Sequence, residues 1–158
     1  MYVIAIDPGT HQSAVVIYDT VKKRPRESVI LDNKDVLTIL CDYPFKRGDN
    51  VLAVEMVACY GMPVGKEVFE TCVWIGRFIE GWNAEHCLVY RQEVKLHFCH
   101  SNKAKDPNIR QALIDRFGPQ GTKKEPGPLY GIKSHEWSAL AVGVFYADKR
   151  NYLSNGEK

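Results

Sequence analysis

The apolar residues of this chain fall into short continuous runs that are separated by turn residues, which is the pattern of buried β-strands. The first run, residues 2–6, ends at Asp7 and is followed by the turn dipeptide Pro8-Gly9. The pattern therefore predicts a strand that turns back into a second strand beside it. The predicted strands are residues 2–6, 13–18, 27–31, 51–54 and 87–90.

Longer stretches carry apolar residues at helical spacing and predict helices between and after these strands. The predicted helices are residues 34–41, 64–82, 107–117 and a last one from Ser134. The helix over 64–82 is apolar on more than one face, so it either lies centrally in the core or shares a face with a second subunit. The order of these elements, without an internal repeat, predicts an α/β fold with a mixed sheet flanked by helices.

Length and composition favour one domain. The chain has 158 residues, of which 45% are hydrophobic, and this is enough for one well-formed core. We expect the domain to span residues 1–150 and a flexible tail to follow over 151–158. No apolar run approaches the roughly 18 residues of a membrane span, and no signal peptide is apparent, so no membrane partner is expected. Five scattered cysteines without a paired spacing fit a reducing cytoplasm.

Two of the predicted strands end in a carboxylate. Asp7 follows the first strand, and Glu55 follows the strand over 51–54. An ionised carboxylate at the edge of an apolar core is costly unless a cation, a hydrogen-bond donor or solvent compensates it. If the two strands are neighbours, the acids converge, and hard divalent cations such as Mg²⁺ or Mn²⁺ prefer such oxygens. The alternative for Asp7 is a turn-capping role for its side-chain oxygens.

A metal centre at these strand ends needs a further ligand. His135 and Glu136, in the first turn of the last predicted helix, are the candidates. The alternative is that both simply suit a helix N-terminus, which holds well for Glu136 and less well for a protonated His135.

Positive charge is clustered rather than global. The formal net charge is only +2, but between residues 101 and 133 seven lysines and arginines outnumber three acids. A nucleic-acid surface and an ordinary solvated face are the two interpretations that charge alone leaves open.

Four segments, in order along nearly the whole chain, carry a more specific pattern. They are residues 4–10 (IAIDPGT), Val54-Glu55, Val94-Lys95 with residues 104–106 (AKD), and residues 135–141 (HEWSALA). Together they resemble the acidic motifs, the basic pair and the closing helix of the RuvC-type Holliday-junction resolvases, particularly the small bacteriophage versions. The resemblance implies an RNase H-like fold, with a mixed five-stranded sheet flanked by helices.

The resemblance also implies an activity. Members are structure-selective crossover junction endodeoxyribonucleases, which resolve Holliday junctions and related branched DNA by symmetric, two-metal phosphodiester hydrolysis. Two Mg²⁺ or Mn²⁺ ions per active site are expected, with Asp7, Glu55 and His135 as ligands. Ser138 stands where many members carry a further Asp, and a hydroxyl is a poorer ligand than a carboxylate. Three alternatives therefore stay open: Glu136 is the fourth ligand, water fills the position, or the second ion is bound weakly.

The same resemblance assigns roles in DNA binding. Lys95 and Lys105 would face phosphate near the scissile bond and act in catalysis. Tyr60 would present its ring to an unstacked base, or it is a partly buried loop aromatic. The expected DNA contacts are Lys103, Lys105, Arg110, Lys123, Lys124 and Tyr60. The expected partners are a four-way DNA junction and a second copy of the chain, in the cytoplasm of a bacterial cell or a phage-infected host.

Two alternatives come from other classes of protein. A protein that grips branched DNA without cutting it is compatible with the weak residue at Ser138. The segment over residues 4–13 also resembles the first phosphate loop of actin-like ATPases, but those proteins need two lobes, for which 158 residues leave no room.

Overall fold

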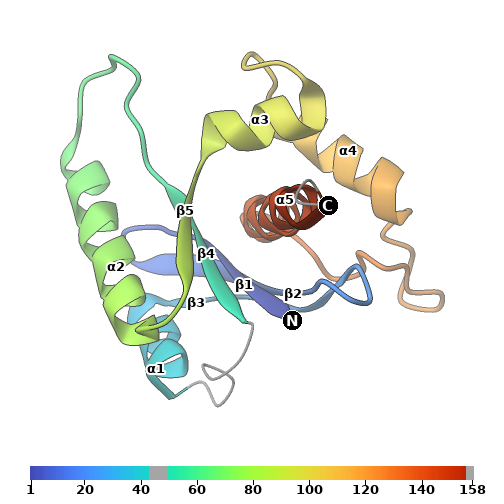
Figure 1. Cartoon of the computed structure of the whole chain (residues 1–158), viewed down its shortest axis with the longest axis horizontal. Coiled ribbons are helices and arrows are strands. Elements are labelled where there is room, and N and C mark those ends of the chain that lie inside the picture. Colours follow the sequence, from blue (N-terminus) through green and yellow to red (C-terminus); the bar gives the residue numbers. More distant parts are fainter. Residues whose placement is uncertain (43–49, 156–158) are drawn as a thin grey trace.

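The computed structural model describes residues 1–42 and 50–155 and contains a mixed β-sheet (Figure 1). Its strand order is β3-β2-β1-β4-β5, in which β1 pairs antiparallel with β2 and parallel with β4. The strands are β1 (Tyr2–Asp7), β2 (Gln12–Asp19), β3 (Arg24–Asp32), β4 (Val51–Met56) and β5 (His86–Tyr90). The predicted α/β fold with a mixed five-stranded sheet is confirmed.

Helices flank this sheet on both sides. They are α1 (Asn33–Asp42), α2 (Lys66–Trp82), α3 (Arg91–Cys99), α4 (Asp106–Phe117) and α5 (Glu136–Asn155). The sequence does not predict α3, because this nine-residue helix buries only Val94 and lacks an apolar stripe. Its start is held by Glu93, whose Oε2 accepts the backbone N–H of Tyr90 at 3.0 Å.

Coverage on both faces explains the continuous apolar runs of the central strands. Helices α1 and α2 lie on one face and α5 on the other, with α3 and α4 around α5 (Figure 1). Along β1, Ile4 and Ile6 belong to the core cluster with α1 and α2, whereas Val3 and Ala5 belong to the cluster with α5. All four are at most 2% exposed. A strand buried on both faces has no solvent side and therefore no polar alternation.

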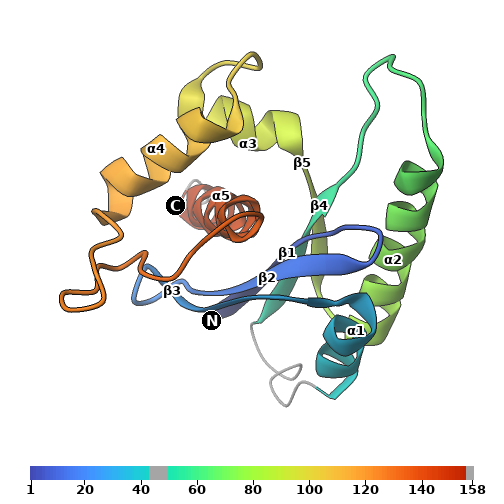
Figure 2. The ribbon, with the colours of Figure 1, turned by 180° about the vertical axis from the view of Figure 1, so that it is seen from behind.

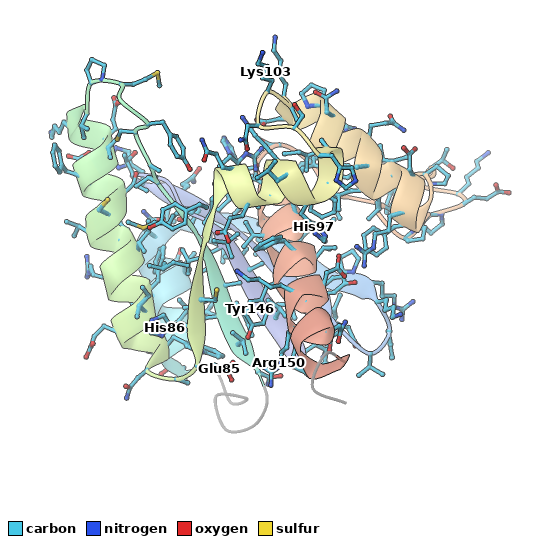
Figure 3. All side chains as sticks on the ribbon, turned by 45° about the horizontal axis from the view of Figure 1, so that its top comes forward. Glu85, His86, His97, Lys103, Tyr146 and Arg150 are labelled. Carbon is cyan, nitrogen blue, oxygen red and sulfur yellow. The ribbon has the colours of Figure 1, made fainter. Side chains whose placement is uncertain are left out.

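The helix α5 packs closely on the sheet. A Cβ atom on Gly143 would lie 3.0 Å from the Cβ of Ala5 and 3.4 Å from that of Tyr18, so a larger residue there would push the helix away. Further along α5, the Tyr146 hydroxyl donates to Glu85 Oε1 at 3.0 Å, just before β5 (Figure 3). These contacts fix the direction of α5 across the sheet, and with it the position of its first turn.

Two expectations from the sequence concern helices: a flexible tail after residue 150 and the absence of a membrane span. The helix α5 continues through Asn155, and residues 156–158 of the expected tail lie outside the described residues. Within residues 1–42 and 50–155, no helix has the length and apolar character that crossing a membrane requires.

Three neighbouring strands, β1, β4 and β5, run parallel, so their carboxyl ends meet at one edge of the sheet. Ile6 pairs in register with Val54, which brings the next residues, Asp7 and Glu55, side by side. Arg91 follows β5 directly and lies at the same edge. We call the edge that carries Asp7, Glu55 and Arg91 the acid edge.

Candidate active site

Asp7 ends β1 at the acid edge, with its side chain only 16% exposed. Its Oδ2 lies 3.0 Å from His135 Nδ1, which brings two of the predicted ligands into contact. Burial raises the pKa of Asp7 above its ordinary value, and the contact with His135 only partly offsets this. No backbone N–H within the described ranges donates to Asp7, and the turn after β1 is held instead by Ser13 Oγ, which accepts Gly9 N–H at 3.3 Å. The geometry therefore does not support the turn-capping role.

Glu55 lies beside Asp7 at the end of β4. Burial and then the charge of Asp7 raise the pKa of Glu55 to about 7, against an opposing effect of Arg91. A carboxylate whose pKa another carboxylate raises is close enough to be repelled by it. Bound cations would relieve that repulsion and favour the ionised form of both groups.

Arg91 supplies the only fixed positive charge that contacts Glu55 among the described side chains, and the sequence pattern did not predict its role. Its Nη1 lies 3.6 Å from Glu55 Oε2, too far for a hydrogen bond, and its Nη2 pairs with Asp106. Glu55 Oε2 and Arg91 Nη1 are both buried and have no hydrogen-bond partner. The signal that could have found Arg91 is its position directly after the third parallel strand, where Asp7 and Glu55 follow the other two.

His135 and Glu136 behave differently despite being neighbours. His135 precedes α5, and its side chain is 74% exposed and directed to Asp7. Glu136 is 3% exposed, and its Oε2 accepts the backbone N–H of Lys133 at 2.8 Å. Its carboxylate therefore closes the turn before α5. Ser138, where the resemblance leads one to look for an acid, is half-buried one turn later.

The donor set at the acid edge fits a hard divalent cation, although it is not a closed metal cage. Within the described ranges, no group of three or more His, Cys, Asp and Glu side chains is gathered tightly enough to hold a metal ion. Asp7 and Glu55 nevertheless offer carboxylate oxygens, and the buried Oε2 of Glu55 lacks a hydrogen-bond partner. An oxygen of this kind is what a hard cation would coordinate.

The predicted basic residues next to the acid edge lie together. Lys95 of α3 lines an open pocket of about 660 Å³ with Lys103, Lys105 and Asp106, which come from the loop after α3 and the start of α4. Figure 3 shows Lys103 projecting from this loop. Because Asp106 also pairs with Arg91, the pocket adjoins the acid edge, and Lys95 lowers the pKa of Glu55. The three lysines therefore line one open pocket beside the carboxylates of the acid edge.

The other predicted cations lie on the loop between α4 and α5 or brace it. Arg110 donates to Gln120 Oε1 at 2.9 Å, and its guanidinium lies 4.8 Å from the centre of the Trp137 ring. It therefore holds the loop against α4 and α5. Lys123 and Lys124 are exposed at the tip of a small hairpin, which the pairing of Gly121 with Pro126 closes.

Tyr60 lies in the segment that follows Glu55 and β4. It is 56% exposed, so the alternative of a partly buried aromatic does not describe it. Its φ is 42° and that of Gly61 is 85°, so the chain turns sharply at this point. The turn leaves the ring on the surface, five residues after Glu55 in the sequence.

The helix α2 has a core role, and it also leaves apolar side chains exposed. Thr71, Ile75, Phe78 and Trp82 are buried in the core. On another face, Phe69 is 63% exposed and Val73 is 62% exposed. Because Phe69 and Val73 are four residues apart, they lie on one face of the helix.

Comparisons with known proteins identify the fold. No family model matches this chain, and no curated protein matches it. The structure is similar to that of RuvC from Thermus thermophilus, with a TM-score of 0.73 and 15% sequence identity over 96% of each chain. It is also similar to T. thermophilus RuvC in complex with a Holliday junction substrate, with a TM-score of 0.67 and 15% identity over 96% of each chain. The chain therefore has the RuvC fold, of RNase H-like type, and the predicted resemblance is confirmed at this level.

Proposed function

We propose that the protein is a divalent-metal-dependent endonuclease that resolves Holliday junctions and related branched DNA by symmetric cleavage. One observation carries the proposal: two largely buried carboxylates meet at the ends of adjacent parallel strands in a chain with the RuvC fold. The solved T. thermophilus RuvC complex with a Holliday junction substrate supports branched DNA as the substrate class. A DNA substrate also fits action in the cytoplasm of a bacterial cell or a phage-infected host.

In this proposal Asp7, Glu55 and His135 hold the metal ions. Mg²⁺ or Mn²⁺, two per site, would supply a water activated for attack and stabilise the leaving oxygen. Because burial and the charge of Asp7 raise the pKa of Glu55 to about 7, a bound divalent cation would favour its ionised form, and metal affinity should increase with pH. Glu136 stays outside the proposed ligand set, because its carboxylate accepts the Lys133 N–H.

The lysines beside the acid edge would orient the DNA. Lys95 and Lys105 face the open pocket and would stabilise the charge that develops on the scissile phosphate. Lys103, Lys123 and Lys124 would contact the backbone and add affinity without reading sequence. Arg110 would act mainly by holding the loop, and the exposed ring of Tyr60 would stack on an unpaired base at the branch.

Two opposed strands of a four-way junction are best cut by two identical sites, so we propose a homodimer that forms through the exposed face of α2. Phe69→Glu, at a position 63% exposed, should give a folded monomer that nicks the junction poorly. Sedimentation measures the oligomeric state. A dimer that survives this change would contradict the role of α2. Trp74 is less suitable for the test, because it packs partly into the core.

The decisive experiment is cleavage of an end-labelled four-way junction beside a linear duplex, with Mg²⁺, Mn²⁺ or EDTA. Paired metal-dependent nicks near the branch are expected, and Asp7→Asn should lower their rate by at least about a hundredfold while junction binding persists. Asp115→Asn makes the same chemical change at an exposed position on α4 and should cleave normally. Nicks that do not depend on Asp7, or a linear duplex cut equally well, would contradict the proposal.

A second candidate, a branched-DNA binding protein without nuclease activity, has one observation in its favour. Within the described residues, the acid edge lacks a preformed group of three metal ligands, and Arg91 already faces Glu55. Tight junction binding with no nicks under any metal would establish this function instead.

A further inference from the structure

A second charged feature lies at the opposite end of β1 from Asp7, where β2 turns into β3. A groove of about 970 Å³ opens there between the β2–β3 turn and the loop that follows α4. Figure 2 shows these two segments, which are far apart in sequence, lying close together. The charged residues that line it are Asp19, Lys22, Lys23, Arg24, Arg26 and Arg116. We call this feature the basic groove.

The basic groove concentrates the positive charge of the protein. It contains five cations and one carboxylate, whereas the whole chain has a formal net charge of only +2. Two of the cations pair with carboxylates outside the lining, and the other three, at residues 22–24, make the groove a positive region. Its carboxylate, Asp19, is already engaged, because Oδ1 accepts the backbone N–H groups of Val21 and Lys22, each at 2.9 Å.

Most of these cations can reach a ligand. Lys22, Lys23 and Arg24 are exposed, and none of them forms an ion pair with another described side chain. Arg116 is different, because Asp148 accepts from its Nη1 at 2.6 Å and from its Nη2 at 2.8 Å. It adds positive charge to the groove while staying tied to α5.

The loop between α4 and α5 joins the basic groove to the acid edge. Residues 126–128 line the groove, and only seven residues after Pro128 the chain reaches His135, which contacts Asp7. The loop is held in place where the Gly127 N–H donates to the Gln120 carbonyl at 2.9 Å. A ligand that follows this loop would meet both sites.

The separation of the two sites suits a DNA duplex. Tyr2 lines the groove and Asp7 ends the same strand, so the sites are about 17 Å apart along β1. This is about the length of five base pairs. Building on the proposed function, we propose that the basic groove binds the phosphate backbone of a duplex arm, about five or more base pairs from the cut. Such contacts would fix the arm without reading its sequence.

The test uses the full chain with Lys22→Gln and Arg24→Gln together. Lys23, whose φ is 50°, lies within the turn itself and stays unchanged. The matched control, Lys34→Gln with Lys149→Gln, removes the same charge from exposed positions outside the groove.

Binding of a labelled four-way junction and of a linear duplex is measured in EDTA between about 50 and 200 mM salt. The association constant falls as salt rises, and losing two phosphate contacts should make the slope of its logarithm against log salt shallower by about 1.8. Over this fourfold range of salt, the wild type should therefore lose about twelvefold more affinity than the groove variant. A hydroxyl-radical footprint should lose its protection about five or more base pairs from the branch. The control variant should match the wild type in both measurements.

An unchanged slope and footprint in the groove variant would overturn the inference, and wild-type cleavage would leave the proposed nuclease function standing. If the wild type neither cleaves nor prefers the junction, the proposed function fails instead. The linear duplex then still tests the groove through the same difference in slope. A wild type that binds no DNA would overturn both.

Discussion

Two aspartates at opposite ends of the β1–β2 pair differ in what compensates their charge. Asp19 lies across from Tyr2, whereas Asp7 lies at the acid edge. Hydrogen bonds from the backbone N–H groups of Lys22 and Val21 hold the pKa of Asp19 below its ordinary value. Burial raises the pKa of Asp7, which receives no backbone hydrogen bond within the described ranges. The charge of Asp19 is therefore compensated by backbone N–H groups of its own turn. The charge of Asp7 is not, so a bound cation could compensate it.

The difference distinguishes a structural carboxylate from one that is poised for a ligand. Glu55 belongs with Asp7, because its Oε2 is buried without a hydrogen-bond partner and its pKa is raised to about 7. An uncompensated carboxylate lowers stability in the absence of a ligand, so its presence at the end of two neighbouring strands calls for a function. Substitutions that remove a compensating cation, or the carboxylate that it compensates, test this distinction.

The largest effect on stability is expected at Arg91, which faces Glu55 and pairs with Asp106. Arg91→Met should lower the free energy of unfolding by about 3 kcal/mol in EDTA, because it leaves the buried carboxylate of Glu55 without a contacting cation. Added Mn²⁺ should recover part of this loss, since the metal replaces the missing charge. Denaturant titrations with EDTA and with Mn²⁺ measure both quantities.

A suitable control for Arg91 is Arg26→Met, since Arg26 forms an exposed pair with Glu27 and should contribute less than about 1 kcal/mol. If Arg91→Met lost the same stability with and without Mn²⁺, Arg91 would only join α3 to α4, and its electrostatic role at the acid edge would be wrong.

Asp148 extends the comparison to a carboxylate that side-chain donors compensate. Its own burial would raise its pKa, but hydrogen bonds from Arg116 and His97 lower the pKa of Asp148 to about 2. Asp148→Asn should therefore lower the free energy of unfolding near neutral pH by about 2 kcal/mol. Because the folded-state pKa is depressed, this contribution is present above pH 3.8 and disappears as the pH falls towards 2. Unfolding curves of the wild type and of Asp148→Asn at pH 7 and at low pH measure this contribution. If the two proteins differed in stability equally at both pH values, the ion-pair account would be contradicted.

The smallest expected effect on stability comes from comparing Asp19→Ala with Asp7→Ala. Asp19→Ala should lower the free energy of unfolding by about 1 kcal/mol, because two backbone N–H groups lose their acceptor. Asp7→Ala should be neutral or slightly stabilising in EDTA, because it removes a carboxylate whose raised pKa reports an unfavourable charge. Thermal unfolding of both variants measures this contrast. A greater loss at Asp7 than at Asp19 would reverse our interpretation.

Much of the acid edge could be predicted from sequence, because a buried strand and the residue after it leave a local signature. The apolar runs before Asp7 and Glu55 mark two strands, and a parallel pairing then suffices to bring the two acids together. His135 could be predicted as a candidate from its place at the start of the last helix, but only the family resemblance favours it over Glu136. Its contact with Asp7 depends on the turn before α5, which no local pattern specifies.

The parts that sequence did not predict depend on contacts between distant segments. Arg91 belongs to the site because β5 adds a third parallel strand beside β4. Glu136 resembles a ligand in sequence, yet the turn at Lys133 uses its carboxylate. The basic groove forms between segments about a hundred residues apart, such as Arg24 and Pro126, so a window along the chain does not reveal it.

The central claim is that Asp7 and Glu55 form a metal site, and the most direct test is thermal unfolding with and without Mn²⁺. At a Mn²⁺ concentration about a hundredfold above its Kd, binding should stabilise the wild type by about 2.7 kcal/mol and raise Tm by roughly 5–10 °C. Asp115→Asn should show the same rise, and Asp7→Asn and Glu55→Gln should lose most of it. An equal rise in all four proteins would place the metal elsewhere and contradict the account.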